Sequence, residues 1–308
     1  MIRTYIVPLG LLLLFGTSGF AQERRWTLEE CIAHAYEHNI EIKTQELTAA
    51  EKRIALAESK WSYAPDLSVS NSSSLATGRV LDETTYEFVE NETVAGNSSS
   101  LGANILLFGG LKNYYNLKRA QLDLRSSLLA VEKMRNDVRM NVTAYYLDYT
   151  TFRIVAPDEG ELIRRDIADT SEEVLDTARG LPELEAARVG IDMARRDLQI
   201  ARTAYWPTLS LTVGYGSSYS DVRQKMFRNT DGTYRYEAYP FFEQYKDNAS
   251  SYVSLSLSIP IFGKFTVRKN VQRQKLAIRQ AEYALRTAEK QVEKEVAQAL
   301  IDARTAWE

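Results

Sequence analysis

The stretch Ala204-Tyr205-Trp206-Pro207-Thr208-Leu209-Ser210-Leu211-Thr212-Val213 decides the fold. It predicts the end of a helix, a proline stop and then a strand, because proline lacks the N–H that a helix interior needs and disfavours helical geometry in the residue before it. The same junction occurs at Ser62-Tyr63-Ala64-Pro65-Asp66-Leu67-Ser68-Val69, so that Pro65 and Pro207 are related by an offset of 142 positions.

This offset matches more than the two prolines. It also aligns helix positions upstream of them, namely Glu41 with Glu183, Ile42 with Leu184, Arg53 with Arg195, Leu56 with Leu198 and Tyr63 with Tyr205. Two strand-to-helix junctions, Ile105-Leu-Leu-Phe-Gly109 and Ile259-Pro-Ile-Phe-Gly263, follow at an offset of 154. The sequence therefore contains one helix–strand–strand–helix unit written twice, with a longer second hairpin.

The composition excludes several classes of function. The chain has 308 residues and a net charge of −3, which gives no electrostatic reason to expect a nucleic-acid partner. Its single cysteine, Cys31, excludes an intrachain disulfide, and two histidines leave little for imidazole catalysis. We find no phosphate-binding loop, nucleophile arrangement or paired-carboxylate motif, and we expect neither an enzyme nor a cofactor.

The N-terminus has the features of a signal peptide, which we place at residues 1–21. Arg3 provides the positive charge, residues 6–15 are apolar, and Gly19-Phe20-Ala21 is typical of a cleavage site. The apolar run is too short to span a bilayer comfortably, and no other stretch is a better candidate for a membrane helix. We therefore expect an exported protein that could enter a membrane only through β-strands.

Alternating apolar and polar residues predict four strands. Their approximate bounds are 66–76, 97–108, 208–220 and 250–262. The stretch 71–100 is rich in Ser, Asn, Thr and Gly and predicts mostly loop, as does the polar, aromatic stretch between 220 and 250. Helices are expected from a capping box at Thr27-Leu-Glu-Glu30, with a break at His38-Asn39, to about Lys60, and again from Pro182 to Tyr205.

Two further helices are long, and they carry apolar residues every seven positions, as in a coiled-coil seam. The first runs from Leu111 to about Arg153 and the second from about Lys264 to Glu308. Their seam positions are Leu117, Leu124, Val131, Val138 and Tyr145, and then Val271, Ile278, Leu285, Val292 and Ala299. A connector at 155–160 divides the mature chain into two repeats, 22–160 and 161–308.

These features together resemble the outer-membrane efflux proteins, the TolC-like channels of tripartite pumps and type I secretion systems. The resemblance rests on Trp26-Thr-Leu-Glu-Glu-Cys-Ile, Tyr205-Trp-Pro-Thr-Leu-Ser-Leu and Pro260-Ile-Phe-Gly263, in that order. It implies an α+β, mostly α fold in which long coiled-coil helices carry two β-hairpins. Each subunit of a homotrimer would contribute four strands to a 12-stranded transmembrane β-barrel, with helices continuing into the periplasm.

The resemblance also implies partners and structural positions. The partners would be further copies of the chain, a periplasmic adaptor, an inner-membrane transporter and outer-membrane lipid. Pro65, Gly109, Pro207 and Gly263 would be the structural junctions between helical and barrel parts. The chain departs from the family in its arms, because the return helices and tip turns are missing and both long helices end at equivalent positions, Arg153 and Glu308. We therefore expect shortened periplasmic arms and a truncated last helix.

Other residues carry weaker interpretations. His34 and His38 are four apart on a helix and could face a metal, but no third ligand is near them. Cys31 reads as a small core residue. Asn71, Asn91, Asn97 and Asn248 fit a glycosylation pattern that is common by chance in Ser-rich loops.

Two sets of residues each allow two interpretations, one related to a membrane channel and one expected of any folded protein. Asp148 and Asp302 align across the repeat and could line a lumen or lie on a solvated helix face. Five tyrosines could form an interfacial aromatic girdle or pack within loops: Tyr215, Tyr219, Tyr234, Tyr236 and Tyr239.

The function predicted from the sequence is that of a non-enzymatic outer-membrane channel subunit, a passive conduit from periplasm to exterior. Two alternatives remain: a periplasmic coiled-coil adaptor or structural protein, and a non-functional fragment of an efflux channel. Carbonate washing of membranes separates the first two, because a channel stays in the membrane and an adaptor washes off.

Overall fold

The computed structural model describes residues 26–81, 88–148 and 171–307. These residues form two compact units, one containing 26–39 and 136–148 and the other containing 40–135 and 171–307. The predicted signal peptide, the end of the first long helix near Arg153 and the connector at 155–160 lie outside the described residues.

The first unit contains helix α1 (Leu28–His38) and the last turns of α3 (Lys112–Asp148). The predicted capping box is present: the Glu30 N–H donates to Thr27 Oγ1 at 3.2 Å, and the Thr27 N–H donates to Glu30 Oε2 at 3.0 Å. Asn39 has extended backbone angles (φ −66°, ψ 124°) and breaks the helix where the sequence predicts a break. Within this unit, the Tyr146 hydroxyl donates to the Trp26 carbonyl at 3.4 Å.

The helices of the second unit repeat with the offsets read from the sequence. Helices α2 (Ile40–Trp61) and α5 (Pro182–Thr203) each have 22 residues, and both of their ends are related by 142 positions. Helices α3 and α7 (Thr266–Trp307) begin 154 positions apart. A short helix, α4 (Ser171–Ala178), contacts α7.

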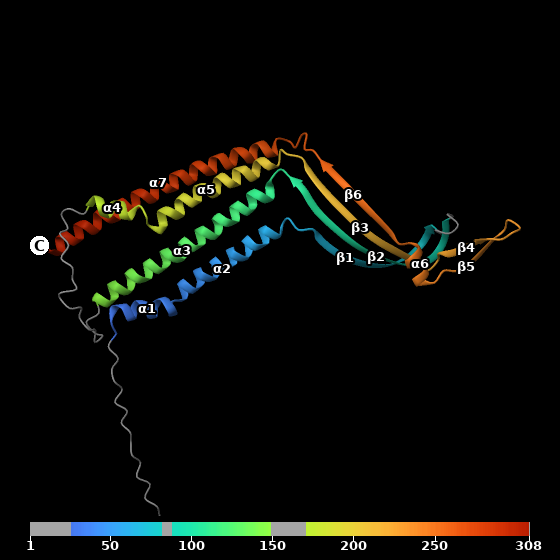
Figure 1. The fold of residues 1–308 in the computed structure, drawn as a ribbon, viewed down its shortest axis with the longest axis horizontal. Coiled ribbons are helices and arrows are strands. Elements are labelled where there is room, and N and C mark those ends of the chain that lie inside the picture. Colours follow the sequence, from blue (N-terminus) through green and yellow to red (C-terminus); the bar gives the residue numbers. More distant parts are fainter. Residues whose placement is uncertain (1–25, 82–87, 149–170, 308) are drawn as a thin grey trace, which may run out of the picture. The chain divides into compact units, whose positions relative to one another are not determined.

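Four antiparallel strands form the main sheet, in the order β1-β2-β3-β6 (Figure 1). They are β1 (Asp66–Leu81), β2 (Phe88–Gly109), β3 (Thr208–Ser220) and β6 (Ser250–Ser258). Thr208 pairs with both Gly109 and Ser258, and Asp66 pairs with Asn104, so all four connections to helices leave the same end of the sheet. The other strand ends, Leu81, Phe88, Ser220 and Ser250, lie at the opposite end of the sheet, which we call the hairpin end.

The first hairpin corrects the loop expected at 71–100, because β1 continues to Leu81 and β2 starts at Phe88. Polar side chains pair across these strands and support the ladder. The pairs are Ser70 with Ser100 at 2.8 Å, Asn71 with Asn97 at 3.1 Å and Thr77 with Thr93 at 3.1 Å. Such cross-strand hydrogen bonds stabilise these strands. The strands lack the alternation of apolar and polar residues from which the sequence would predict them.

The expected loop between 220 and 250 also contains regular structure. A two-stranded sheet, β4 (Gln224–Arg228) and β5 (Tyr234–Ala238), is followed by the short helix α6 (Phe241–Asp247). Strand β6 ends at Ser258 rather than at 262. Pro260 follows two residues later and cannot donate to a strand ladder, which accounts for the earlier end.

The best-packed helix contact joins α5 to α7. Ala178, Leu184 and Val292 form a buried cluster, and Leu181, Ala288 and Val296 pack against it. Val131 and Val138 of the predicted seam in α3 are also buried, whereas Leu124, Ile278 and Leu285 are half-buried.

The seven-residue seam does not continue to the ends of the long helices. Tyr145 and Ala299, its last positions, are exposed. Leu300 is instead half-buried, and it lines a groove together with Leu184 and Arg188 of α5. An α-helix that does not supercoil drifts away from a seven-residue repeat by about 20° per heptad, which moves the last positions out of the contact.

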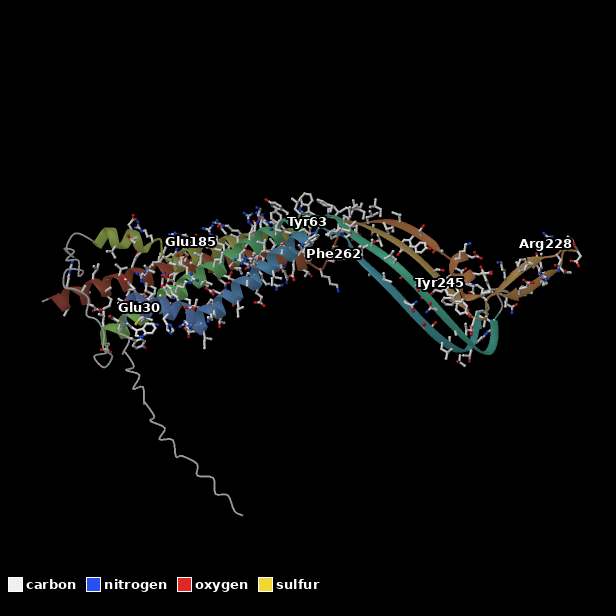
Figure 2. All side chains as sticks on the ribbon, turned by 60° about the horizontal axis from the view of Figure 1, so that its bottom comes forward. Glu30, Tyr63, Glu185, Arg228, Tyr245 and Phe262 are labelled. Carbon is white, nitrogen blue, oxygen red and sulfur yellow. The ribbon has the colours of Figure 1, made fainter. Side chains whose placement is uncertain are left out.

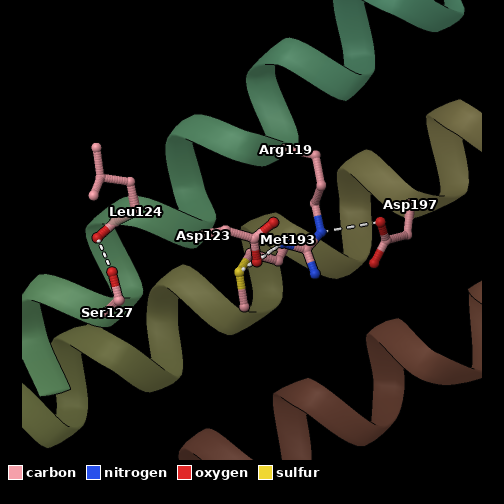
Figure 3. Close-up of polar contacts among 6 residues, drawn as sticks. All are labelled: Arg119, Asp123, Leu124, Ser127, Met193 and Asp197. Atoms are coloured by element: carbon pink, nitrogen blue, oxygen red, sulfur yellow. Dashed lines mark hydrogen bonds and ion pairs between the residues drawn. The ribbon is translucent and has the colours of Figure 1, made fainter. Parts of the chain in front are cut away.

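Ion pairs connect the two repeats through α3 and α5. Arg119 donates through Nε to Asp197 Oδ1 at 3.0 Å and through Nη1 to the Met193 sulfur at 3.1 Å, and it also pairs with Asp123 of its own helix (Figure 3). Further along, Lys133 lies 3.6 Å from Glu183. Because Arg119 pairs with Asp197 and Lys133 with Glu183, the two helices run antiparallel.

Candidate functional site

The main sheet has two chemically different faces, and the strand register defines them. Residues directly opposite each other on paired strands point to the same face, and successive residues alternate between faces. Leu211 pairs with both Ile105 and Leu255, while its neighbour Thr212 pairs with both Asn104 and Ser254. One pleat row is therefore aliphatic across three strands, and the next row is polar.

The apolar face is built from aliphatic residues at every second position of all four strands. Although these residues are apolar, most of them are exposed; Val253, for example, has a relative accessibility of 72%. Contiguous apolar surface of this kind marks a face that another apolar phase or a partner covers. Its members are Leu67, Val69, Leu101, Ala103, Ile105, Leu209, Leu211, Val213, Val253, Leu255 and Leu257.

The opposite face, which we call the serine face, carries small polar residues and glycine. Two large side chains lie on it: Leu106, which pairs with Ser210, and Tyr252, whose ring lies over Gly214, where an added Cβ would come within 2.3 Å of the ring. Asn104 accepts a hydrogen bond from Thr212 at 3.1 Å across two strands. The face comprises Ser68, Ser70, Ser72, Ser98, Ser100, Gly102, Asn104, Ser210, Thr212, Gly214, Ser254, Ser256 and Ser258.

Exposed aromatic residues gather at both ends of the sheet. Figure 2 shows Tyr63 and Phe262 at the helix junctions and Tyr245 at the hairpin end. The junction also carries Trp61, Tyr205, Trp206 and Phe265, all exposed. Our sequence reasoning missed this group because its members lie in three separate turns, although the repeated Tyr-x-Pro junction could have indicated it.

The five tyrosines proposed from sequence as a girdle lie at the hairpin end, in different elements. Tyr215 and Tyr219 are on β3, whereas Tyr234 and Tyr236 are exposed on β5. Tyr239 precedes α6 and donates its hydroxyl to Asp247 at 2.8 Å. Desolvation and then the Asp247 carboxylate raise the pKa of Tyr239. The girdle itself stays a prediction.

The four predicted junction residues lie between helices and strands. Pro65 and Pro207 each directly precede a strand, β1 and β3. Gly109 is the last residue of β2, and Gly263 lies between β6 and α7. Their function as junctions between a helical part and a barrel stays a prediction.

Positive backbone φ angles mark the two junctions where a strand passes into a helix, β2 to α3 and β6 to α7. They begin one residue after the predicted junction residues Gly109 and Gly263. They occur at Gly110 (62°) and Leu111 (66°), and again at Lys264 (51°) and Phe265 (58°). These two pairs are related by the same offset of 154. A left-handed pair thus turns the chain from strand into helix in both repeats.

The remaining sequence candidates have structural roles in the described residues. The rings of His34 and His38 stack with centroids 4.1 Å apart, and Trp26 lies edge-on to His34 at 5.1 Å. No group of three or more possible metal ligands occurs within 26–81, 88–148 and 171–307. Cys31 is half-buried, and burial followed by the Glu30 charge raises the pKa of its thiol.

The predicted glycosylation and lumen residues are also placed. Asn71 and Asn97 hydrogen-bond to each other, and Asn248 donates to the Ser218 carbonyl at 2.7 Å. Asn91 lies within β2. Asp148 and Asp302 are exposed on helices, with Asp302 accepting from Gln298 at 2.8 Å. Across the described helices, none is both long and apolar enough to cross a membrane.

Comparison with known structures identifies the fold. The outer membrane protein VceC from Vibrio cholerae has a TM-score of 0.61 at 10% identity, over 90% of this chain and 79% of its own. A membrane protein from Pseudomonas aeruginosa has a TM-score of 0.65 at 15% identity, over 90% and 77%. The CmeC outer membrane channel of Campylobacter jejuni has a TM-score of 0.62 at 16% identity, over 89% and 70%.

The fold is therefore that of the TolC-like outer-membrane channels. Residues 176–308 match the family described as "Outer membrane efflux protein". This match, over the second repeat, agrees with the family resemblance read from the sequence; the members of that family are outer-membrane channels that extend into the periplasm. The curated protein sequences contain no match to the chain.

Proposed function

We propose that this chain is the channel subunit of an outer-membrane export system, a tripartite efflux pump or a type I secretion system. The observation that carries the proposal is the two-faced sheet. A sheet with one aliphatic face and one face of hydroxyl and glycine residues matches the alternation required of a strand between lipid and a water-filled lumen.

The dimensions of the apolar face support this proposal. Strand β6 has nine residues, and the apolar face on β3 extends over Leu209, Leu211 and Val213 before Tyr215. A tilted strand needs about 9–11 residues to cross the hydrocarbon core. Aromatic residues at both ends of the band match the girdles of barrels at the two membrane interfaces.

Closure by further copies of the chain would satisfy the sheet edges. Strands β1 and β6 are the edge strands of the sheet, and an open edge in lipid leaves backbone groups unpaired. Pairing β1 of one copy with β6 of the next removes every edge. Three copies would give the 12-stranded barrel implied by the family resemblance.

The helices beside these edges carry matching apolar stripes. Helix α2, which leads into β1, exposes an apolar residue every seven positions: Ile40, Leu47, Ile54 and Trp61. Helix α7, which follows β6, exposes Leu276 and Tyr283, also seven apart. If β1 and β6 of neighbouring copies pair, these stripes come together and form the missing coiled-coil contact.

In this proposal the chain is a passive conduit and not an enzyme. Small polar residues of the serine face would line the lumen, and energy would come from inner-membrane partners reached through a periplasmic adaptor. The exposed apolar face distinguishes this function from that of a periplasmic adaptor, which has no need for a lipid-facing sheet.

Neighbouring residues on β6 provide the test. Leu255→Lys places a charge on the apolar face, whereas Ser254→Lys places the same charge on the serine face. A lysine at the bilayer midplane costs about 2–4 kcal/mol in a barrel, and a lumen-facing one costs little. We expect carbonate-washed outer membranes to retain Ser254→Lys and to lose most of Leu255→Lys.

Equal retention of the two variants would contradict the proposal. Release of the unmodified chain by carbonate would instead favour the adaptor alternative.

A further inference from the structure

Helix α6 lies on the apolar face of the sheet, at its hairpin end. The Tyr245 hydroxyl bonds to Asn97 and lies 3.1 Å from Ser99 Oγ, and the Ser217 hydroxyl donates to the Tyr245 carbonyl at 2.6 Å. Asn97, Ser99 and Ser217 occupy alternate positions in register with Leu101 and Val213, so they belong to the apolar face. The polar end of that face is thus covered by α6.

The helix is held firmly in this place. Gln244 is completely buried, accepts from the Ser220 N–H at 3.1 Å, and donates to the carbonyls of Ser220 and Tyr239 at 2.9 and 2.7 Å. The Phe241 ring packs between Tyr219, with centroids 4.9 Å apart, and Tyr245, at 4.6 Å. Two sides of the helix are therefore occupied by the protein.

The outer side of α6 combines one large apolar residue with one cation. At about 100° per residue, Phe242 and Lys246 fall on the same side, four positions apart. Phe242 is 84% exposed, the second most exposed large apolar residue described. Lys246 has no ion-pair partner among the described residues, whereas Lys225 pairs with Glu243 at 3.1 Å on the other side.

We propose that α6 is an interfacial anchor, with Phe242 inserted at the boundary between headgroups and acyl chains and the Lys246 ammonium directed to lipid phosphate. The inference rests on the proposed membrane sheet, because only that sheet aligns α6 with a bilayer surface. An aromatic ring below a snorkelling lysine is the arrangement that an interfacial helix uses. The apolar face ends next to α6, at Tyr215, and this end marks the depth of the boundary between headgroups and acyl chains.

The position of α6 suggests what the anchor does. A barrel closed by copies of one chain has to keep its hairpin end at a fixed depth in the bilayer. Gln244 and Tyr245 fix α6 to β3, so the depth at which Phe242 lies in the lipid also sets the depth of the strand. The partner of this surface is therefore a lipid leaflet, not a second protein.

The test places an environment-sensitive fluorophore, NBD, on single cysteines in a Cys31→Ser background. The variants are Phe242→Cys, Val253→Cys on the apolar face and Ser254→Cys on the serine face. Each full chain is reconstituted into vesicles of phosphatidylcholine and phosphatidylglycerol, with spin labels on headgroups, on shallow acyl carbons or on deep acyl carbons. Quenching reports which part of the lipid each probe contacts.

We expect quenching at 242 mainly by the headgroup and shallow labels, at 253 by the deep labels, and none at 254. A probe at 242 that stays in water, while 253 is quenched and 254 is not, overturns the anchor and leaves the channel proposal standing. A probe at 242 shielded from water but unquenched by lipid means that protein covers α6, and it also overturns the inference. Equal quenching at 253 and 254 rejects the membrane sheet and the anchor with it.

Discussion

Ile42 and Leu184 occupy the same position in two copies of one helix, 142 residues apart, and are 0% and 2% exposed. They lie in the first turn of α2 and α5, respectively. The repeated unit therefore preserves a packing position as well as a pattern of polar and apolar residues.

Truncating either side chain should destabilise the protein strongly. Ile42→Ala and Leu184→Ala each leave a cavity, at a cost of about 2–5 kcal/mol in the free energy of unfolding. Lys52→Ala, at an exposed position of α2 outside its apolar stripe, should cost less than about 0.5 kcal/mol. Denaturant unfolding in detergent measures all three, and similar losses for Ile42→Ala and Lys52→Ala would refute the packing equivalence.

The stability of the protein should change in opposite directions when a Cβ is added at one left-handed junction, Gly110, and removed at the other, Lys264. Gly110→Ala adds a Cβ that would lie 2.7 Å from Trp206 Cβ and 2.9 Å from the Thr203 carbonyl, at a φ of 62°, so it should destabilise the junction. Lys264→Gly, at the equivalent position of the second repeat, should stabilise by up to about 1 kcal/mol, because it removes the left-handed penalty of a residue with a side chain.

The same unfolding measurement checks both changes. Arg279→Gly, at an exposed position well inside α7, is the control, since glycine in a helix interior should cost about 1 kcal/mol. Destabilisation by Lys264→Gly comparable to that control would contradict the strain account.

Gln244 should hold the segment between β3 and β6 in place. Gln244→Leu leaves the Ser220 N–H without its side-chain acceptor and two carbonyls without a donor, and each lost partner costs about 1–3 kcal/mol if the group stays buried. We expect faster protease cleavage within 221–249. Lys246→Leu, on the exposed side of the same helix, should leave the cleavage pattern unchanged.

The Arg119–Asp197 pair should couple the two repeats. The side chains are 25% and 37% exposed, and a double-mutant cycle with alanine should give a coupling energy of about 1 kcal/mol that falls as salt is added. Arg179 and Asp176 form a pair whose side chains are 74% and 76% exposed, and the same cycle there should give close to zero. Equal coupling in both cycles would show that the position between α3 and α5 adds nothing.

The sequence by itself predicted the repeated unit, its two offsets and the places where helices and strands meet. These features depend on local chemistry: prolines stop α2 and α5 before β1 and β3, and Thr27 with Glu30 starts α1. The alternation of leucine, valine and serine likewise indicated strands near Leu67, Leu101, Leu209 and Val253. Such signals are contained within a few neighbouring residues, so they can be read without a structure.

Other features required the tertiary structure, because they depend on which distant residues are opposite each other. The Asn71–Asn97 ladder extends β1 and β2 through a stretch whose composition indicates a loop. The register of β2 with β3 brings Asn97, Ser99 and Ser217 to one face, and Tyr245 places α6 there. A one-residue slip would move each of these groups to the other face, and no local pattern in a polar strand prevents that slip. Long-range pairing alone therefore decided which side of the sheet carries the helix and its exposed Phe242.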